Sequence, residues 1–115
     1  MIHIGDIYWA ATLDNYGNKS EIIHPQVVLQ DTAINNSRIS TIVVCGISTN
    51  MKKAHEPGNI LLHPGESNLP KQSIIVVSEI SIAQKVDFTK YIGTISEERM
   101  TQLFSGMKFI QSFQK

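Results

Sequence analysis

The sequence predicts a mainly β protein, a small twisted sheet or open barrel covered by one C-terminal helix. Short apolar runs rich in β-branched residues follow one another up to residue 94, separated by clusters of turn-forming residues. Beyond residue 94 the apolar spacing becomes that of a helix. Strands followed by a single amphipathic helix indicate a sheet that the helix covers. No repeat or linker interrupts this pattern, so we expect a single domain over residues 1–115.

Three strands are expected in the first half of the chain, at residues 7–11, 26–30 and 41–45. The first is aromatic and β-branched, and the turn formers of residues 12–20 predict a loop after it. Pro25 opens the second strand, where a missing backbone donor is tolerated. Asp31 is a suitable N-cap for one or two helical turns within residues 31–37. The third strand is apolar enough to be buried on both faces.

Three more strands are expected at residues 59–62, 73–77 and 91–94, the last being the weakest. Residues 51–58 are polar and basic, and residues 63–70 are dense in turn formers, so both are predicted to be irregular. Ser96 is a suitable N-cap for the final helix, and acidic residues follow it in the first turn, where the helix dipole favours them. One apolar stripe of this helix is expected to pack on the sheet. It comprises Met100, Leu103, Phe104, Met107 and Ile110.

Composition narrows the classes of protein. The chain has ten Lys plus Arg and ten Asp plus Glu, so its formal net charge is zero. Neutrality argues against a protein that coats long duplexes, yet it allows a local basic patch for a few nucleotides of single strand. Cys45 is the single cysteine and cannot form an internal disulfide. With no signal-peptide pattern and no apolar run near the roughly 20 residues of a membrane span, we expect a cytoplasmic protein.

Five motifs occur in an order and spacing that resemble the PemK/MazF family of toxin endoribonucleases. They are the Gly-Asp-Ile-Tyr-Trp start at 5–9, Gly17 followed by His24-Pro25 and an apolar strand, the strand ending in Ile-Ser at 47–48, the segment 73–80, and Gly-Thr-Ile-Ser-Glu-Glu at 93–98. The resemblance implies an SH3-like twisted sheet with a long C-terminal helix. It also implies a homodimer with RNA-binding grooves near the interface. An antitoxin with an acidic, disordered tail would block those grooves.

The resemblance further implies sequence-preferring, metal-independent cleavage of single-stranded RNA. In the family an arginine and a Thr or Ser hydroxyl perform it, through attack of the 2′-hydroxyl that leaves a 2′,3′-cyclic phosphate and a 5′-hydroxyl. Here His24 stands at the arginine position and Ser48 supplies the hydroxyl, so these are the predicted catalytic residues. A histidine side chain titrates near pH ~6.5 and can accept or release a proton, whereas arginine stays charged.

The predicted RNA contacts surround this pair. Lys52, Lys53 and His55 form a basic cluster shortly after Ser48, and Lys19 lies in the first loop. Tyr16 is a candidate for stacking on a base, whereas Trp9 is expected in the core or an interface. Glu79 and Ser81 stand where the resemblance places a family glutamine and arginine. These seven RNA-binding candidates are Tyr16, Lys19, Lys52, Lys53, His55, Glu79 and Ser81.

The sequence supports other functions less strongly. A catalytically inactive relative that binds RNA or a protein remains an alternative, because the family arginines are replaced. CcdB-like toxins of the same architecture end in Trp-Gly-Ile and bind gyrase, whereas residues 111–115 here read Gln-Ser-Phe-Gln-Lys. The four histidines show no zinc spacing, and neither a Walker loop nor a Gly-x-Ser-x-Gly elbow occurs, so no metal or other cofactor is expected.

Overall fold

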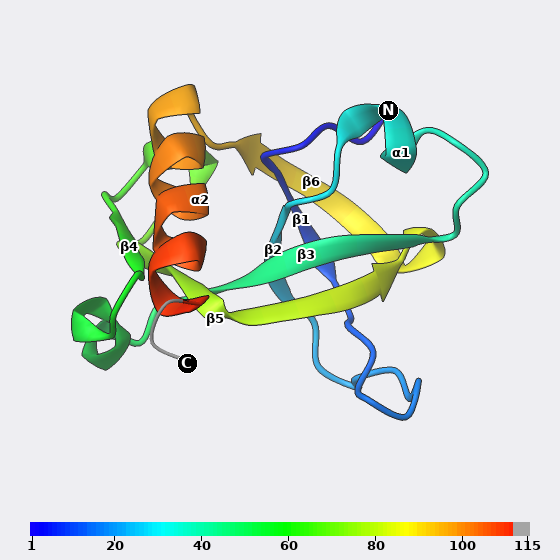
Figure 1. Cartoon of the computed structure of the whole chain (residues 1–115), viewed down its shortest axis with the longest axis horizontal. Helices are drawn as coiled ribbons and strands as arrows, with labels where there is room; N and C mark the ends of the chain where they lie inside the picture. Colours follow the sequence, from blue (N-terminus) through cyan, green and yellow to red (C-terminus); the bar gives the residue numbers. More distant parts are fainter. Residues whose placement is uncertain (112–115) are drawn as a thin grey trace.

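Six antiparallel strands form one sheet in the order β4-β5-β3-β2-β1-β6, in a computed structural model that describes residues 1–111 (Figure 1). The strands are β1 (Asp6–Ala10), β2 (His24–Val28), β3 (Thr41–Ser48), β4 (Ile60–Leu62), β5 (Ser73–Gln84) and β6 (Phe88–Thr94). The helices are α1 (Thr32–Asn35) and α2 (Glu97–Gln111), with short 3-10 turns η1 (Met51–His55), η2 (Glu66–Asn68) and η3 (Lys85–Asp87). The predicted mainly β fold with a C-terminal helix is therefore confirmed. The segment 111–115, on which the sequence contrast with CcdB-like toxins depends, lies outside the described residues beyond Gln111.

Predicted strands lie where the sequence placed them, but three are longer than expected. β3 continues to Ser48, β5 continues to Gln84, and β6 begins at Phe88. The second half of β5 is mostly exposed, so it lacks the apolar run that identifies a buried strand. The 3-10 turn η1 was not predicted, since its polar and basic residues carry no helical apolar period.

The two predicted helix caps are present. The Asp31 carboxylate accepts a hydrogen bond from the Ala33 N–H at 2.8 Å, and the Ser96 hydroxyl oxygen accepts one from the Arg99 N–H at 3.2 Å. These caps satisfy backbone donors that the first helical turn leaves without partners. Each helix consequently begins directly after its capping residue.

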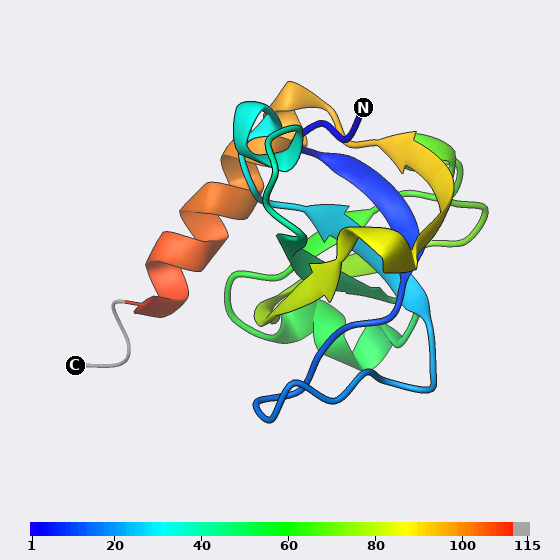
Figure 2. The same cartoon turned by 90° about the vertical axis from the view of Figure 1, so that its right-hand side faces the viewer.

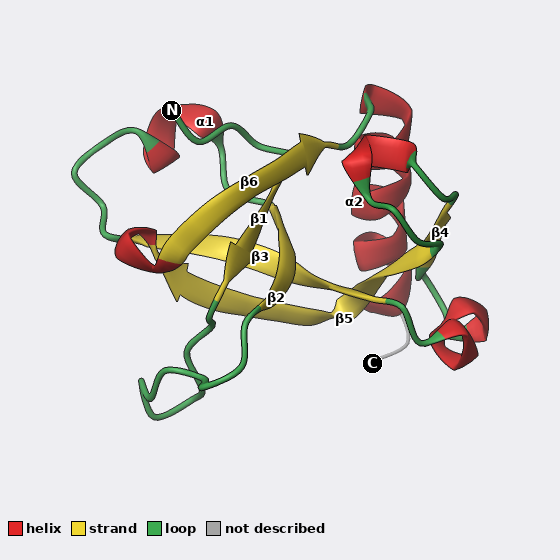
Figure 3. Cartoon of the chain, turned by 180° about the vertical axis from the view of Figure 1, so that it is seen from behind, coloured by secondary structure: helices red, strands yellow, loops and turns green. Residues whose placement is uncertain are grey.

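Helix α2 lies across one end of the sheet, beside β4 and β5 (Figures 1 and 3). Leu103 is fully buried beneath it, and Met100, Met107 and Ile110 pack around the same core cluster. The prediction that Phe104 belongs to this stripe is wrong, because its side chain is 44% exposed. Its neighbour Leu103 already faces the sheet, and one residue further turns the helix by about 100°.

Two core clusters lie on opposite faces of the sheet, because side chains alternate between faces along a strand. Residues Val27, Cys45 and Ile47 belong to the cluster under α2, whereas Val28 and Val44 belong to the other cluster. The even-numbered residues at this part of β2 and β3 therefore face away from α2. Figure 2 shows α2 along one side of the sheet and the β1–β2 loop, drawn in blue, projecting from it. Within residues 1–111, no helix combines the length and apolar character needed to cross a bilayer.

A large bulge interrupts the pairing of β3 with β5. Cys45 pairs with Ile80 and Ile47 pairs with Ile75, so four residues of β5 oppose Gly46 alone. Hydrogen bonds hold the bulge: the Cys45 thiol donates to the Val76 carbonyl oxygen at 3.0 Å, and the Val77 N–H donates to Asn59 Oδ1 at 3.0 Å. Bulges redirect side chains and often lie next to active sites. This one sets the direction of Glu79.

Candidate functional site

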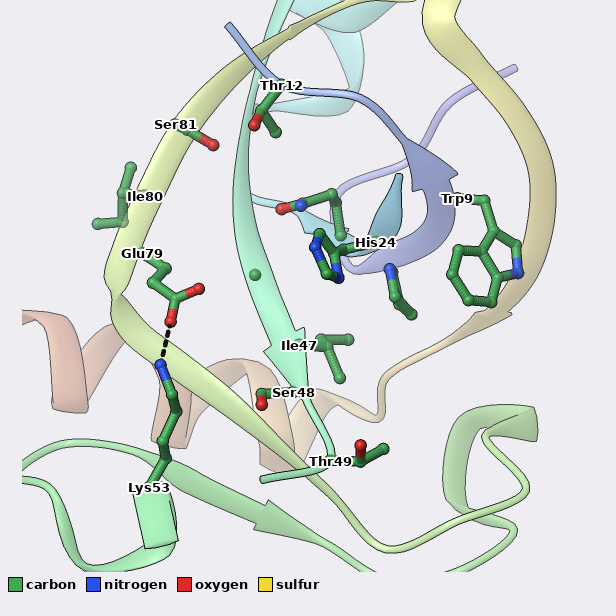
Figure 4. A pocket seen from close by; sticks show the side chains of 13 residues that line it. Trp9, Thr12, His24, Ile47, Ser48, Thr49, Lys53, Glu79, Ile80 and Ser81 are labelled. Carbon is green, nitrogen blue, oxygen red and sulfur yellow. Dashed lines mark hydrogen bonds and ion pairs between the residues drawn. The ribbon is translucent and has the colours of Figure 1, made fainter. Parts of the chain in front are cut away.

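A pocket of about 690 Å³ opens above β2, β3 and β5 (Figure 4). Its volume lies within the range of about 300–1,000 Å³ usual for small-molecule sites. Its polar lining side chains are Thr12, His24, Gln26, Ser48, Thr49, Lys53, Glu79 and Ser81. These residues come from three neighbouring strands and the adjoining segments. The site is therefore built mainly on the sheet rather than on a single loop.

The register of the sheet brings the two predicted catalytic residues to this pocket. Gln26 of β2 lies opposite Gly46 of β3 in an antiparallel pair. His24 is two residues before Gln26, and Ser48 is two residues after Gly46. Because side chains alternate between faces along a strand, both lie on the same face of the sheet as Gln26 and Gly46. Both side chains line the pocket. The two residues therefore lie on one face of the sheet and line one pocket, and their catalytic role stays a prediction.

His24 is exposed, and its imidazole makes no hydrogen bond to any other residue in the described part of the chain. Both ring nitrogens are consequently available to a ligand. Ser48 ends β3, and its hydroxyl oxygen accepts a hydrogen bond from the Asn50 N–H at 3.0 Å. That bond uses a lone pair and leaves the hydroxyl hydrogen free to donate.

Gly46 forms the floor between these residues and Glu79. A Cβ atom at Gly46 would lie 3.1 Å from Glu79 Oε1, so any larger residue would crowd the carboxylate. Glu79 Oε2 pairs with Lys53 Nζ at 2.9 Å, across the mouth of the pocket (Figure 4). The hydrogen bond to Glu79, and then its charge, raise the pKa of Lys53 above its ordinary value. The lysine therefore stays protonated.

Gln26 was not predicted as a site residue. It is only 6% exposed, and its Oε1 atom is buried without a hydrogen-bond partner. Buried polar atoms without partners are uncommon and call for an explanation. The available signal was a polar residue between Pro25 and the apolar Val27, at a strand position that would otherwise be expected to be apolar. A single polar residue of this kind does not distinguish a buried position from an exposed one.

The predicted site residues divide into two groups. His24, Ser48, Lys53, Glu79 and Ser81 line the pocket. The other four candidates lie outside its lining.

Those four residues are exposed. Tyr16 is 89% exposed on the β1–β2 loop, and Lys19 pairs with Asp87 at 3.0 Å. Lys52 and His55 are exposed on η1, where only Lys53 reaches the pocket. Trp9, which was expected in the core or an interface, is half-buried, belongs to neither core cluster and lines the pocket, and its place in an interface stays a prediction. The contacts of Tyr16, Lys19, Lys52 and His55 with RNA remain predictions.

The chemistry of the pocket is that of hydrogen-bond donors and proton carriers. Among residues 1–111, no three His, Cys, Asp or Glu side chains converge on a point that would hold a metal ion. Burial, and to a lesser extent the charge of Glu79, raise the pKa of the Cys45 thiol beneath the floor to about 12. It is therefore a structural thiol and not a nucleophile. The pocket suits a small, negatively charged ligand that exchanges protons. It offers a lysine, a hydroxyl, an imidazole and a carboxylate around a glycine that has no side chain.

Comparison with solved structures defines the class of the fold. An endoribonuclease from a mycobacterial species, solved in complex with its cognate antitoxin, superimposes with a TM-score of 0.77 at 14% identity, covering 100% of this chain and 99% of the other. The Mycobacterium tuberculosis toxin MazF-mt6 superimposes with a TM-score of 0.73 at 13% identity, covering 89% of this chain and 91% of the other. The chain therefore has the MazF-like fold.

Residues 3–110 match the family model of the PemK-like, MazF-like toxins of type II toxin–antitoxin systems, and the chain belongs to that family. Its relatives include endoribonuclease MazF6 of Mycobacterium tuberculosis, 29% identical over 108 residues, which cover 94% of this chain and 95% of the relative. Endoribonuclease MazF of Staphylococcus epidermidis is 25% identical over 103 residues, covering 90% of this chain and 85% of the relative. The family resemblance inferred from the motifs is thus confirmed.

Proposed function

We propose that this chain is a toxin that cuts single-stranded RNA without a metal ion. The observation that carries the proposal is the convergence of His24 and Ser48 on one pocket with a glycine floor. Relatives across nearly the whole chain length are named endoribonucleases. The substrate supplies its own nucleophile, the 2′-hydroxyl, so the protein needs only to move protons and stabilise charge on the phosphate.

The reaction has a defined balance of bonds. The 2′-hydroxyl loses its proton, a bond forms between the 2′-oxygen and phosphorus, and the bond from phosphorus to the 5′-oxygen breaks. A proton then passes to the departing 5′-oxygen, leaving a 2′,3′-cyclic phosphate and a 5′-hydroxyl. His24 carries one of these protons, and the free hydroxyl hydrogen of Ser48 donates to a non-bridging phosphate oxygen.

The test is an end-group analysis. Long single-stranded RNA is incubated with the protein in EDTA between about pH 5 and pH 9, and cyclic phosphate and 5′-hydroxyl ends are expected. His24→Ala should slow cleavage by about 10²–10⁴-fold, the usual worth of a proton carrier. Ser48→Ala should also slow it strongly, since it removes a donor to developing charge. Intact RNA throughout this pH range, with a folded wild-type protein, would refute the proposal.

Matched controls separate chemistry from folding. His63→Ala and Ser105→Ala remove the same functional groups outside the pocket and should leave the cleavage rate unchanged. Circular dichroism should show the same fold for all four variants.

A non-catalytic RNA-binding toxin is the alternative function. One observation favours it: His24 and Ser81 line the pocket where the resemblance places two arginines, so the pocket lacks those guanidinium groups to stabilise charge on the phosphate. Under that alternative, RNA binds to the pocket and stays intact. An electrophoretic shift without new end groups would establish it in place of the nuclease.

The proposed partners follow from the same pocket. A cognate antitoxin with an acidic, disordered tail would cover it and compete with phosphate for Lys53. One solved relative with this fold is held by its cognate antitoxin. A homodimer would cover exposed apolar side chains such as Ile82 of β5, which is 45% exposed. Light scattering that gives a monomer at micromolar concentration would contradict the dimer.

A further inference from the structure

Glu79 is an unexpected side chain beside a phosphate site. Its side chain is about half exposed, makes one ion pair, to Lys53, and belongs to neither core cluster. A negative charge at that position repels RNA phosphate and weakens the attraction of Lys53 for it. A group that costs affinity in this way calls for a role in the chemical step.

The sheet places Glu79 and His24 on opposite sides of Gly46. β2 and β5 are the two neighbours of β3, so they lie about two strand spacings, or about 10 Å, apart across that glycine. The bulge in β5 aims the Glu79 carboxylate over the glycine, at which a Cβ would lie 3.1 Å from Oε1 (Figure 4). The space between the imidazole and the carboxylate is open, because residue 46 has no side chain.

Such a space fits one ribose and its 3′-phosphate. In-line attack requires that the entering 2′-oxygen and the departing 5′-oxygen lie on opposite sides of phosphorus. A base and an acid that serve them must therefore face each other across the phosphate. His24 and Glu79 have this arrangement, and Ser48 lies on the same face as a donor to the non-bridging oxygens.

We propose that Glu79 is a catalytic residue, the general base that takes the 2′-hydroxyl proton, and that His24 is the general acid that protonates the departing 5′-oxygen. This assignment rests on the proposed RNA cleavage and gives it a mechanism. Lys53 holds the carboxylate in place through the 2.9 Å contact. The family glutamine that the resemblance places here would be unable to accept the proton in this way.

At the end of the reaction, each of the two groups has the protonation state opposite to the one in which it began. Glu79 leaves as a carboxylic acid and His24 as a neutral imidazole, and exchange with water restores both. The rate should consequently fall at low pH, where the carboxylate is protonated, and at high pH, where the imidazole is neutral. Lys53 from η1 and Cys45 from β3 are the other titratable groups facing Glu79. The lysine stays charged and the buried thiol stays protonated across this range.

The decisive variant is Glu79→Gln, which keeps the shape and removes the base. We expect kcat to fall by about 10²–10⁴-fold, and the decline of log kcat at low pH to disappear. KM for RNA should stay equal or decrease, because Lys53 is freed to bind phosphate. Glu98→Gln, the same change on α2 outside the pocket, should match the wild type. If Glu79 only repelled the substrate, Glu79→Gln would instead raise kcat/KM.

A modified substrate assigns the two roles. An RNA in which sulfur replaces the 5′-bridging oxygen has a leaving group that departs without protonation. This substrate should restore His24→Ala toward the wild-type rate and leave Glu79→Gln slow. Two results would overturn the assignment while leaving RNA cleavage established. One is that the modified substrate rescues Glu79→Gln and not His24→Ala. The other is that Glu79→Gln has a kcat within about threefold of the wild type and keeps the decline at low pH. A wild-type protein that leaves RNA intact would instead overturn both this assignment and the proposed function.

Discussion

Gln26 and Gly46 face each other across two strands, and both deviate from what a buried sheet position usually carries. Gly46 has no side chain, which leaves room for a ligand and for the Glu79 carboxylate beside it. Gln26 is buried, yet its Oε1 has no partner among the described residues. A buried acceptor without a partner costs about 1–3 kcal/mol. We therefore expect these two residues to lower the stability of the fold while they form a polar floor beneath the pocket.

Gln26→Leu should separate these two effects. Leucine is similar in size and removes the unpaired acceptor, so the free energy of unfolding should rise by about 1 kcal/mol. The side-chain amide of Gln26, a residue that lines the pocket, is lost, so the dissociation constant for RNA should rise about 5–10-fold, which corresponds to one modest hydrogen bond. Urea unfolding and fluorescence anisotropy with labelled RNA measure the two quantities.

Gln30→Leu, two residues beyond the end of β2, is the matched control. Its amide donates to the Thr41 carbonyl oxygen at 3.1 Å and accepts from the Val43 N–H at 3.3 Å. Losing two satisfied bonds should lower stability while RNA binding is unchanged. Equal losses of stability in both variants would show that the Gln26 amide has partners after all.

At the residue scale the sequence identified part of the site. His24 and Ser48 could be placed together because they occupy motif positions at the ends of two strands, and the pocket contains both. Lys52 and His55 could not be separated from Lys53, because a 3-10 turn decides which of the three side chains reaches the pocket. Gln26 was missed, and Trp9 was expected in the core or an interface rather than in the pocket, because residue type alone does not tell which face of a curved sheet is covered.

At the scale of elements, the long strand β5 joins the two halves of the molecule. Its first half is buried and pairs with β4 and the end of β3, whereas its second half is exposed and pairs with the start of β3. The sequence predicted only the apolar first half. The β5 side of the bulge, residues 76–79, contains no glycine or proline that would mark it, and it is held by the thiol of Cys45 and the amide of Asn59. Such contacts depend on the tertiary fold.

Helix α2 is joined to the turn η2 by an ion pair whose effect depends on pH. Arg99 Nε and Nη2 donate to the two carboxylate oxygens of Glu66 at 2.6 and 3.0 Å. The hydrogen bond from Arg99 is the main cause of a lowered pKa for Glu66. A carboxyl group with a lowered folded-state pKa stabilises the fold above its ordinary pKa, and this contribution is lost as pH falls through the lowered value.

Glu66→Gln should therefore lower the free energy of unfolding by about 1 kcal/mol near pH 7, since the pair is partly exposed and screened. The difference from wild type should shrink as pH falls below the ordinary carboxyl range, because the wild type loses the same interaction there. Urea unfolding at several pH values measures this, with Glu21→Gln in the exposed β1–β2 loop as the control. A difference that stays constant down to about pH 2 would contradict the role of the charge.

At the scale of the whole molecule, charge is balanced and locally paired. Ten basic and ten acidic residues give no net charge, and ion pairs such as Lys19–Asp87 and Lys53–Glu79 join segments far apart in the sequence. The composition alone predicted this weak overall field, which gives little long-range attraction for RNA. The strand order could not be predicted from local sequence patterns, because β1 pairs with β6 and β3 with β5 across long stretches of chain.

This balance predicts a shallow dependence of RNA binding on salt. Each phosphate neutralised on a single strand contributes about −0.7 to the slope of log K against log salt. With Lys53 as the lysine lining the pocket, we expect a total slope of about −0.7 to −1.4, corresponding to one or two phosphates. Lys53→Ala should reduce the slope by about 0.7, whereas Lys71→Ala, outside the pocket lining, should leave it unchanged. Anisotropy titrations of inactive His24→Ala protein between about 50 and 200 mM salt measure these slopes without cleavage. A slope near −4 would instead show that RNA crosses a broad basic surface, which a single pocket of this composition does not provide.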